Sequence, residues 1–437
     1  MRFQSGGRVH ASDRGPVLEE TASQAGLVFV SRFGRVTVRV AVVGASGLAG
    51  FAVVEYLLEK GIETVPLVGS TGNSWRLFSQ GITPQLVNVL HPDGLSRALG
   101  GCTHVVNCLR GDENVMLQGT RNLVKEALRA GATRFVHVSS VAVYGDRPAP
   151  GAAVESAMPS VEKGGYGWIK LRQDEIVQRT AARGLKSIIL CPPNIVGPGS
   201  YFLLEILGCL LRGELLLADG GSCVCSTVDA RNLAHACFLA LSEGSTNGER
   251  YFVTDDERVT WASIVDGLRA AGQIAARPPE CTLEELRRTS EERAVPKPRL
   301  WVSVKHLVSD DVRSALRKDP LLAKIDGALR AFVGGFGPQM EDRFRLAIEG
   351  PIKVPRKPGD AKMNVRLSAQ QLRGVWHRCD KAKVELGYRP ICTFARSMAA
   401  FSRWLQSTRG MLEPDWSSRK ILFGYSEAEK ESVHQHI

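Results

Sequence analysis

The strongest constraint on the fold is a regular alternation of short β-branched runs with amphipathic segments, which extends from residue 36 to residue 190. The expected strands are 36–43, 64–68, 104–107, 134–138 and 186–190, and the expected helices between them are 51–60, 95–99, 118–130 and 166–183. Strands that alternate with helices over short connections are joined by right-handed crossovers. The pattern therefore predicts an α/β fold with a doubly wound parallel sheet. Ligands are then expected at the carboxyl ends of the strands.

Beyond residue 192 the alternation weakens, and the chain divides into four regions. We expect a flexible N-terminal extension over 1–35, the parallel-sheet domain with interleaved substrate-binding segments over 36–275, an insertion or lid over 276–375, and the C-terminal part of a smaller substrate-binding region over 376–437. Three further helices (202–212, 232–241, 261–271) and one strand (250–254) are expected. In the insertion, residues 321–333 form an amphipathic candidate helix that ends at the glycine cluster 334–338. A core-facing helix is the simpler interpretation of it, with a membrane-surface helix as the alternative.

Composition and charge exclude several classes of protein. Hydrophobic residues make up 44% and charged residues 23%, as in an ordinary globular protein. The net charge of +11 comes from basic residues spread along the chain, so we expect no nucleic-acid partner. No apolar stretch of about 18 residues occurs, so no integral membrane segment is expected. The ten cysteines lack paired Cys-x-x-Cys motifs, which predicts reduced thiols in a cytoplasmic protein without a bound metal.

A glycine-rich turn separates the first expected strand from the first expected helix. It reads Gly44-Ala-Ser46-Gly47-Leu48-Ala-Gly50. Glycine permits a tight turn and lets backbone approach a pyrophosphate, while the N–H groups at the helix start face the anion. The strand–turn–helix context favours a dinucleotide site over a turn that only packs. We expect Gly44, Ser46, Gly47, Leu48 and Gly50 to contact the cofactor.

The end of the second strand distinguishes NAD from NADP in sites of this kind. A carboxylate there would bind the ribose hydroxyls and repel a 2′-phosphate. The segment 67–74 contains no acidic residue, and Ser70, Thr71 and Arg76 could each contact a phosphate. The sequence thus predicts an NAD(P) site, with Ser70 among its residues and a preference for NADP.

Tyr166 and Lys170 are four residues apart on an expected helix, so their side chains share one face. An unperturbed tyrosine has a pKa of about 10, too high for a base at neutral pH. A neighbouring ammonium favours the phenolate, so the pair could remove a proton from an alcohol or donate one to a carbonyl. Ser140 follows the strand 134–138 and could hydrogen-bond the same substrate oxygen. We therefore predict a catalytic set of Ser140, Tyr166 and Lys170.

Several ordered motifs make the chain resemble the extended short-chain dehydrogenases/reductases, or NAD-dependent epimerase/dehydratase family. These motifs are the turn 44–50, the segment 138–145 (Val-Ser-Ser-Val-Ala-Val-Tyr-Gly), the pair Tyr166 and Lys170, the segment 119–123 (Gly-Thr-Arg-Asn-Leu), the segment 191–199 (Cys-Pro-Pro-Asn-Ile-Val-Gly-Pro-Gly) and the closing segment 381–390. The resemblance covers about residues 38–272 and 378–405. It selects Ser140 over Ser139, because the family's catalytic Ser or Thr lies four residues before the tyrosine that matches Tyr144.

The resemblance implies a Rossmann fold and more cofactor contacts. Asn88 and Val89 should contact the adenine, Leu109 should pass close to the nicotinamide half, and Pro193 should line the nicotinamide pocket. A homodimer through the helices after the fourth and fifth strands is also implied.

Departures from the family's pattern bear on the substrate. The family's frequent Arg before Pro-Pro-Asn is Cys191 here, and the Arg that holds the diphosphate of nucleotide sugars aligns with Cys225. A thiol cannot make a bidentate phosphate contact. The segment 226–236 is closer to a 3β-hydroxysteroid dehydrogenase-like branch, in which Asp229 or Arg231 could face the pocket. We expect a dehydrogenase or reductase acting on a small-molecule secondary alcohol or ketone. A nucleotide-sugar epimerase or dehydratase, and a non-catalytic NAD(P)-binding sensor or scaffold, are the alternatives.

Overall fold

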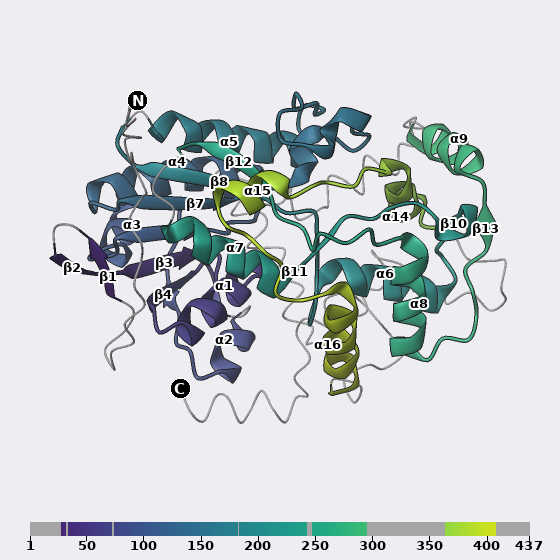
Figure 1. Cartoon of the computed structure of the whole chain (residues 1–437), viewed down its shortest axis with the longest axis horizontal. Helices are drawn as coiled ribbons and strands as arrows, with labels where there is room; N and C mark the ends of the chain where they lie inside the picture. Colours follow the sequence, from purple (N-terminus) through teal and green to yellow (C-terminus); the bar gives the residue numbers. More distant parts are fainter. Residues whose placement is uncertain are drawn as a thin grey trace, which may run out of the picture. The chain divides into compact units, whose positions relative to one another are not determined.

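Seven parallel strands form the central sheet of the protein, in the order β12-β8-β7-β6-β3-β4-β5 (Figure 1). Their bounds are β3 (Arg39–Val43), β4 (Glu63–Val68), β5 (Gln85–Leu86), β6 (His104–Asn107), β7 (Arg134–Val138), β8 (Lys186–Cys191) and β12 (Glu249–Phe252). Every pairing between neighbours in this sheet is parallel. The order runs outward in both directions from β3, which confirms the predicted doubly wound α/β fold.

The computed structural model describes residues 28–31, 34–71, 74–181, 183–242, 247–294 and 363–407. The described residues form two compact units. The first contains the sheet and takes in the chain up to residue 208, then 220–277 and the part from residue 370; the second contains 209–219 and 278–369. No helix in the described ranges is long and apolar enough to cross a membrane.

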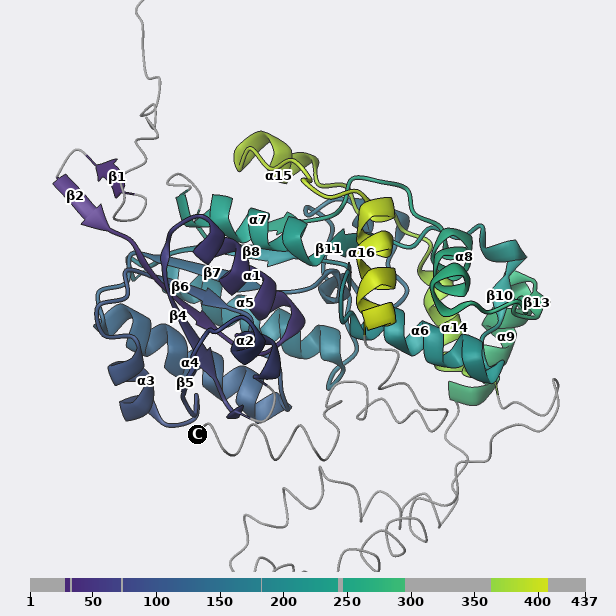
Figure 2. The same ribbon diagram turned by 90° about the horizontal axis from the view of Figure 1, so that it is seen from below.

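Alternate residues of the strands feed two hydrophobic cores on opposite faces of the sheet. Val40 and Val42 pack under α1 (Leu48–Glu59) and α7 (Ala230–Ser242), whereas Ala41 and Val43 pack on the face with α3 (Pro92–Ala98), α4 (Glu113–Arg129) and α5 (Tyr166–Ala181). Figures 1 and 2 show these two helical layers with the sheet between them. Successive side chains of a strand point to opposite faces, so a strand that is buried on both sides is apolar throughout.

The chain start and several helix starts differ from the predictions, with α1, α3 and α4 each beginning three or more residues early. The expected strand 36–43 is two strands, because β2 (Gly34–Thr37) leaves the sheet at Val38 and pairs antiparallel with β1 (Val28–Ser31). The remaining residues of the predicted extension lie outside the described residues. Helix α1 begins three residues earlier than expected, directly after Gly47. Helix α4 begins five residues earlier, because the carboxylate of Asp112 caps it by accepting from the backbone N–H of Val115 at 2.8 Å.

Elements after β8 complete the first unit. They are β9 (Asn194–Val196), α6 (Tyr201–Arg212, which continues into the second unit), η4 (Asp219–Gly221), β11 (Thr227–Asp229), α8 (Trp261–Gly272), η5 (Ala369–Arg373), α15 (Asp380–Glu385) and α16 (Phe394–Ser407). The short helices α2 (Trp75–Ser79), η2 (Val141–Tyr144) and η3 (Pro150–Ala153) lie in loops of the sheet domain. Strands β9 and β11 pair in parallel, and α16 packs on α8.

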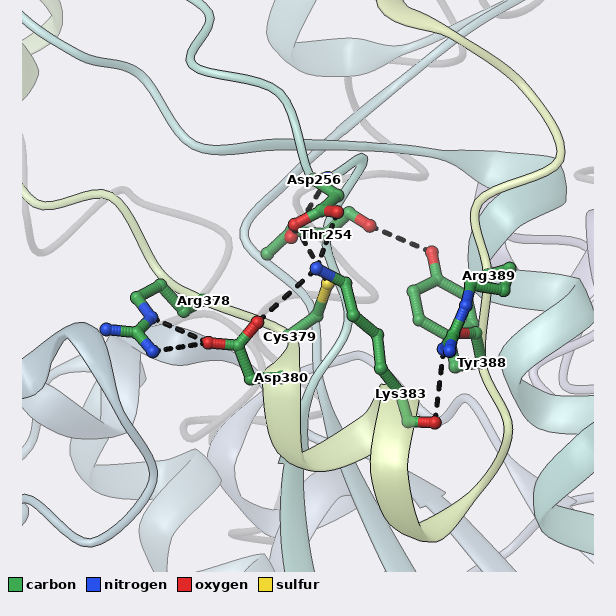
Figure 3. A network of polar contacts seen from close by, with 8 residues as sticks. All are labelled: Thr254, Asp256, Arg378, Cys379, Asp380, Lys383, Tyr388 and Arg389. Atoms are coloured by element: carbon green, nitrogen blue, oxygen red, sulfur yellow. Dashed lines mark hydrogen bonds and ion pairs between the residues drawn. The ribbon is translucent and has the colours of Figure 1, made fainter.

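The closing segment returns to the sheet domain through α15. Figure 3 shows its polar contacts: Lys383 bridges Asp256 and Asp380, and the Tyr388 hydroxyl donates to the backbone oxygen of Thr254 at 2.9 Å. Tyr388 is fully buried beneath this network. The closing segment thus contributes to the core beside α7 as well as to the surface.

The second unit contains β10 (Leu217–Ala218), β13 (Glu280–Cys281), α9 (Leu283–Ala294) and α14 (Val365–Ser368). β10 and β13 pair in parallel, and Ser368 accepts a backbone hydrogen bond from Leu216 at 3.1 Å. The predicted amphipathic helix 321–333 and the glycine cluster 334–338 lie outside the described residues.

Candidate active site

Two glycines of the turn after β3, Gly44 and Gly50, leave room for backbone only. Gly44 has a φ of +78°, and a Cβ there would lie 2.6 Å from the backbone oxygen of Cys108. A Cβ on Gly50 would lie 2.2 Å from the backbone oxygen of Gly44. The positive φ and the two close approaches explain why glycine stands at both positions. The turn lies at the carboxyl end of β3, with Cys108 at the end of the neighbouring β6.

Gly47 differs from the other two glycines of the turn. A Cβ there would meet nothing closer than 3.4 Å, and the residue is exposed. It is the N-cap of α1, and within the described part of the chain no side chain caps this helix start. Ser46 and Leu48 flank it and are half-buried. This combination of an uncapped helix start and an open glycine fits a bound pyrophosphate.

Of the residues expected to contact the cofactor after β4, two are exposed and the third is engaged within the protein. Ser70 and Thr71 are exposed directly after the strand. Arg76 is not free, because its guanidinium donates to the backbone oxygen of Gly199 at 3.0 Å and lies over the Trp75 ring. Burial lowers the pKa of Arg76. Arg76 therefore holds the loop after β9, which removes it as the first choice for a phosphate ligand.

The residues assigned to the adenine and nicotinamide are brought together by Gly119 of α4. A Cβ on Gly119 would lie 2.7 Å from the Val89 side chain and 3.0 Å from that of Leu109. The side chain of Asn122, one turn further along α4, donates to the backbone oxygen of Val89 at 3.0 Å. Asn88 is exposed, and its own carboxamide oxygen accepts from the Leu90 backbone. The side chains of Val89 and Leu109 thus pack side by side against α4.

The two serines after β7 differ in exposure. Ser139 is 3% exposed, whereas Ser140 is half-buried and caps η2, its hydroxyl accepting from the Ala142 backbone at 3.1 Å. The backbone oxygen of Pro192 accepts from Val141 at 3.1 Å, which brings the turn containing Pro193 beside this end of β7. Ser140 is therefore the more exposed of the two serines, and its catalytic role stays a prediction.

Helix α5 brings Tyr166 and Lys170 beside η2, the short helix that Ser140 caps. A Cβ on Gly167 would lie 2.2 Å from the backbone oxygen of Ala142, so the first turn of α5 packs closely against η2. Tyr166 is 45% exposed at the start of α5. Lys170 is 4% exposed, and its ammonium donates to the backbone oxygen of Val138 at 3.0 Å. A fixed, buried cation thus lies one turn behind an accessible phenol.

Arg110 adds a second cation to the site. It follows β6 in the loop before α4, and its guanidinium carbon lies 5.8 Å from the centroid of the Tyr166 ring. The residue is exposed. No local pattern in the sequence indicates Arg110, because only the fold brings residue 110 to the start of α5.

Sequence analysis also missed three polar side chains buried in the sheet domain. Asn107, His137 and Asp174 are each 0% exposed. Asn107 ends β6 and His137 lies within β7, each next to buried valines, and Asp174 lies four residues after Lys170. Polar residues at positions expected to be buried were the signal that could have found them.

The side chains considered for the substrate side are largely engaged within the protein. Cys225 is 4% exposed and accepts from the Asn194 side chain at 3.3 Å; burial raises its pKa to about 12. Arg231 makes a bidentate ion pair with Glu59 of α1, and Asp229 is buried. Neither of these two charges is free for a ligand. In the described ranges, no three His, Cys, Asp or Glu side chains gather as a metal site.

Comparison with known proteins identifies a family, sequence relatives and structures of similar fold. Residues 40–253 match the model of the NAD dependent epimerase/dehydratase family. Sterol-4-alpha-carboxylate 3-dehydrogenase, decarboxylating, of Dictyostelium discoideum is 23% identical over 235 residues, which are 50% of this chain and 71% of that protein. UDP-glucose 4-epimerase of Thermotoga maritima superposes with a TM-score of 0.57 at 15% identity, covering 85% of this chain and 99% of the epimerase. dTDP-glucose 4,6-dehydratase of Streptomyces venezuelae, solved with NAD, gives 0.57 at 19% identity, covering 86% and 99%.

Proposed function

Because residues 40–253 match the model of the NAD-dependent epimerase/dehydratase family, the chain belongs to this family of extended short-chain dehydrogenases/reductases, and we propose that it oxidises a secondary alcohol or reduces the matching ketone. The observation that carries the proposal is the arrangement on α5. A half-exposed Tyr166 lies one helical turn from Lys170, whose ammonium is buried and held by the backbone oxygen of Val138. Phenol and ammonium in this arrangement suit proton transfer to and from a substrate oxygen.

Each residue of the proposed set has one role. The Tyr166 phenolate accepts the hydroxyl proton of the alcohol during oxidation, and the phenol returns it during reduction. The Lys170 ammonium stabilises the phenolate by its charge. Ser140 donates a hydrogen bond to the same substrate oxygen and so orients the reacting carbon. The bound NAD(P) supplies the hydride acceptor or donor.

The residues expected to hold the cofactor remain those of the sequence prediction. Gly44, Gly47 and Gly50 would face the pyrophosphate, since a side chain has no room at two of them and the third is open. Ser70 would face the adenosine ribose. The absence of a carboxylate in the described residues 69–71 after β4 supports NADP. Because Arg76 donates to Gly199, the polar side chains among these described residues are the hydroxyl groups of Ser70 and Thr71. Titration with NADPH and NADH, monitored by reduced-nicotinamide fluorescence, tests this preference; tighter binding of NADH would reverse it.

An apolar alcohol such as a sterol is the substrate class that we propose. Cys225 stands where a diphosphate-binding Arg is expected in nucleotide-sugar enzymes, and it is buried with its sulfur engaged by Asn194. The similarity to a sterol-4-alpha-carboxylate dehydrogenase supports the same class. A nucleotide-sugar epimerase or dehydratase is the second candidate, favoured by the fold similarity to UDP-glucose 4-epimerase. It would need another diphosphate anchor.

The test is a comparison of the wild type with Tyr166→Phe and Ser140→Ala. With a panel of 3β-hydroxysterols and their ketones, the loss of acid–base catalysis should lower kcat by about 10²- to 10⁴-fold in Tyr166→Phe. Cofactor binding should be retained. Unchanged turnover in Tyr166→Phe would remove the phenol from the mechanism. Cofactor binding without turnover of any panel member or of UDP-sugars would instead favour the sensor or scaffold alternative.

A second measurement separates the two enzymatic candidates. An epimerase returns the hydride to its own substrate, so it needs no net supply of oxidised or reduced cofactor. Stoichiometric formation of NAD(P)H with a sterol alcohol supports the dehydrogenase. Interconversion of UDP-sugars without a net change in absorbance would establish the epimerase.

A further inference from the structure

A buried chain of polar groups lies directly behind the proposed catalytic pair. Tyr166, Lys170 and Asp174 follow one another at intervals of four residues along α5, so they lie on one face of the helix. Exposure falls along this series from 45% to 4% to 0%. Asp174 is therefore the innermost of three ionisable side chains in a row, and the proposed reaction assigns it no role.

Arg250 of β12 binds the Asp174 carboxylate. Its Nε donates to Oδ2 of Asp174 at 2.7 Å, across 76 residues of sequence. The guanidinium side chain is 16% exposed and lines a cavity of about 510 Å³ at the β12 edge of the sheet. Burial raises the pKa of Asp174, and the charge of Arg250 opposes this effect. A buried carboxylate that has a fixed guanidinium partner can remain ionised.

A directional series of hydrogen bonds determines the protonation of His137. The Asn107 carboxamide oxygen accepts from the Leu109 backbone at 3.0 Å, which leaves its amide nitrogen to donate to Nδ1 of His137 at 3.1 Å. Nδ1 must then be the acceptor, so the proton of the neutral imidazole is on Nε2. Nε2 lies 3.6 Å from Oδ1 of Asp174 and has no hydrogen-bond partner among the described residues. Burial and the nearby Lys170 charge keep the pKa of His137 well below its usual value.

From this geometry we infer that Asp174, anchored by Arg250 and faced by neutral His137, is a positioning residue that keeps the Lys170 ammonium charged behind Tyr166. Two cations, Lys170 and Arg250, and one anion, Asp174, leave the cluster with a single excess positive charge. A phenolate at Tyr166 neutralises that charge. This inference rests on the proposed function of Tyr166 and Lys170.

Other titratable groups surround Asp174 on every element that packs against it. They are Lys170 on α5, His137 on β7, Cys191 on β8, Arg250 on β12 and Tyr144 on η2. Burial raises the pKa of Cys191 and of Tyr144, so both are neutral at the pH values of interest. Among the described groups around Asp174, the charge balance is therefore set by Lys170, Asp174 and Arg250, and the exposed Arg110 over the Tyr166 ring is the same in every variant.

The test is a charge-balance series: Asp174→Asn, the double variant Asp174→Asn/Arg250→Gln, and the control Glu175→Gln. Glu175 is the next residue of α5, partly exposed and paired with Arg172, so its substitution changes the same charge outside the cluster. Removing the Asp174 charge makes neighbouring protons easier to lose. Both limbs of the kcat/KM profile should move to lower pH by about one unit in Asp174→Asn. The double variant restores one excess positive charge and should return both limbs to their wild-type positions.

A substrate-free measurement keeps the inference separate from the proposed function. Each protein is titrated by the ultraviolet absorbance of phenolate, with and without Tyr166→Phe, so that the difference isolates one of the seven tyrosines. A Tyr166 step that moves to lower pH in Asp174→Asn, returns in the double variant and stays in place in Glu175→Gln supports the inference. The same step unmoved in Asp174→Asn overturns the inference and leaves the proposed function intact.

Two further outcomes are decisive. If the wild type shows no ionisation of Tyr166 at a pH below that of ordinary tyrosines, the proposed function fails, and the inference fails with it. If Asp174→Asn does not fold, the double variant still decides, because it also removes the Arg250 guanidinium that would otherwise have lost its carboxylate partner. Limbs displaced from wild type in a folded double variant would overturn the charge-balance account.

Discussion

At the scale of single residues, the three glycines of the first turn carry different constraints. Gly44 and Gly50 are held by backbone atoms that leave no room for a methyl group, whereas Gly47 is open. A substitution at each position therefore separates the stability of the turn from its affinity for a ligand.

We predict that Gly50→Ala destabilises the protein by about 2 kcal/mol and weakens cofactor binding at least about tenfold, because the new Cβ would force Gly44 out of place. Thermal unfolding and reduced-nicotinamide fluorescence measure the two effects. Gly47→Ala is the matched control: its stability should stay within about 1 kcal/mol of wild type. Equal destabilisation by both substitutions would show that the turn is not limited by the Gly50–Gly44 contact.

At the scale of elements, buried polar side chains join segments that are far apart in sequence. Asn232 of α7 is 0% exposed and uses every hydrogen-bonding group of its carboxamide. Its nitrogen donates to Asp255 and to the backbone oxygen of Cys392, each at 2.7 Å, and its oxygen accepts from the backbones of Ile391 and Cys392. One side chain thus connects α7, the loop after β12 and the chain that leads to α16.

Asn232→Leu conserves volume but leaves several buried polar groups without partners, so we expect a loss of about 3–5 kcal/mol in the free energy of unfolding. Urea denaturation measures it. Arg231→Gln is the control, because the neighbouring Arg231 makes an exposed ion pair with Glu59 that contributes at most about 1 kcal/mol. A loss under 1 kcal/mol in Asn232→Leu would contradict the role assigned to this side chain.

His377 connects the closing segment to the sheet domain and is sensitive to acid. It is 6% exposed, with Nδ1 3.2 Å from the Ser226 hydroxyl and its ring edge-on to Phe252. Burial lowers its pKa to about 4. An unfolded histidine, with a pKa of about 6.5, takes up a proton before the folded one does. Stability supplied by neutral His377 is therefore complete above about pH 6.5 and is lost as the pH falls toward 4.

We predict that the wild type loses about 3 kcal/mol relative to His377→Gln between pH 7 and pH 4. Chemical denaturation at several pH values measures this difference, in which the other titrating groups cancel. A difference that is constant across the range would mean that His377 is as easily protonated in the folded protein as in the unfolded chain.

At the scale of the whole molecule, the first unit is built from segments at both ends of the described chain. The buried core on the α1/α7 face contains Cys379, Ala382, Leu386 and Tyr388 from the C-terminal segment 376–407, which includes the closing segment. A chain that stops before this segment lacks part of its core and all the partners that Asn232 finds there.

We therefore predict that a chain ending after Val375 is unfolded or aggregates, as measured by circular dichroism and gel filtration. Adding residues 376–407 as a separate peptide should restore a cooperative thermal transition, since the segment contributes by packing rather than by chain connection. A truncated chain that folds alone would show that the closing segment is an accessory. Gel filtration of the intact protein also tests the predicted homodimer.

Local patterns were enough to predict the parallel sheet, the strands β6 and β7 to the residue, the glycine turn and the spacing of Tyr166 and Lys170. These features depend on neighbours in sequence. They are the apolar periodicity, the glycines at turns, and a spacing of four residues that places two side chains on one face of a helix. The same patterns missed the break between β2 and β3 and the starts of α1 and α4, where individual caps and pairings decide.

Only the tertiary structure decided which polar groups meet. Arg76 finds Gly199 across 123 residues, Arg250 finds Asp174 across 76, and Asn232 finds Cys392 across 160. Such pairs follow no periodicity, because they form where the packed elements bring a donor and an acceptor within hydrogen-bond distance. The sequence by itself determined the sheet and the glycine turn at its edge; the tertiary structure decided which charged groups lie together behind the proposed catalytic pair, since buried charges respond to neighbours in space.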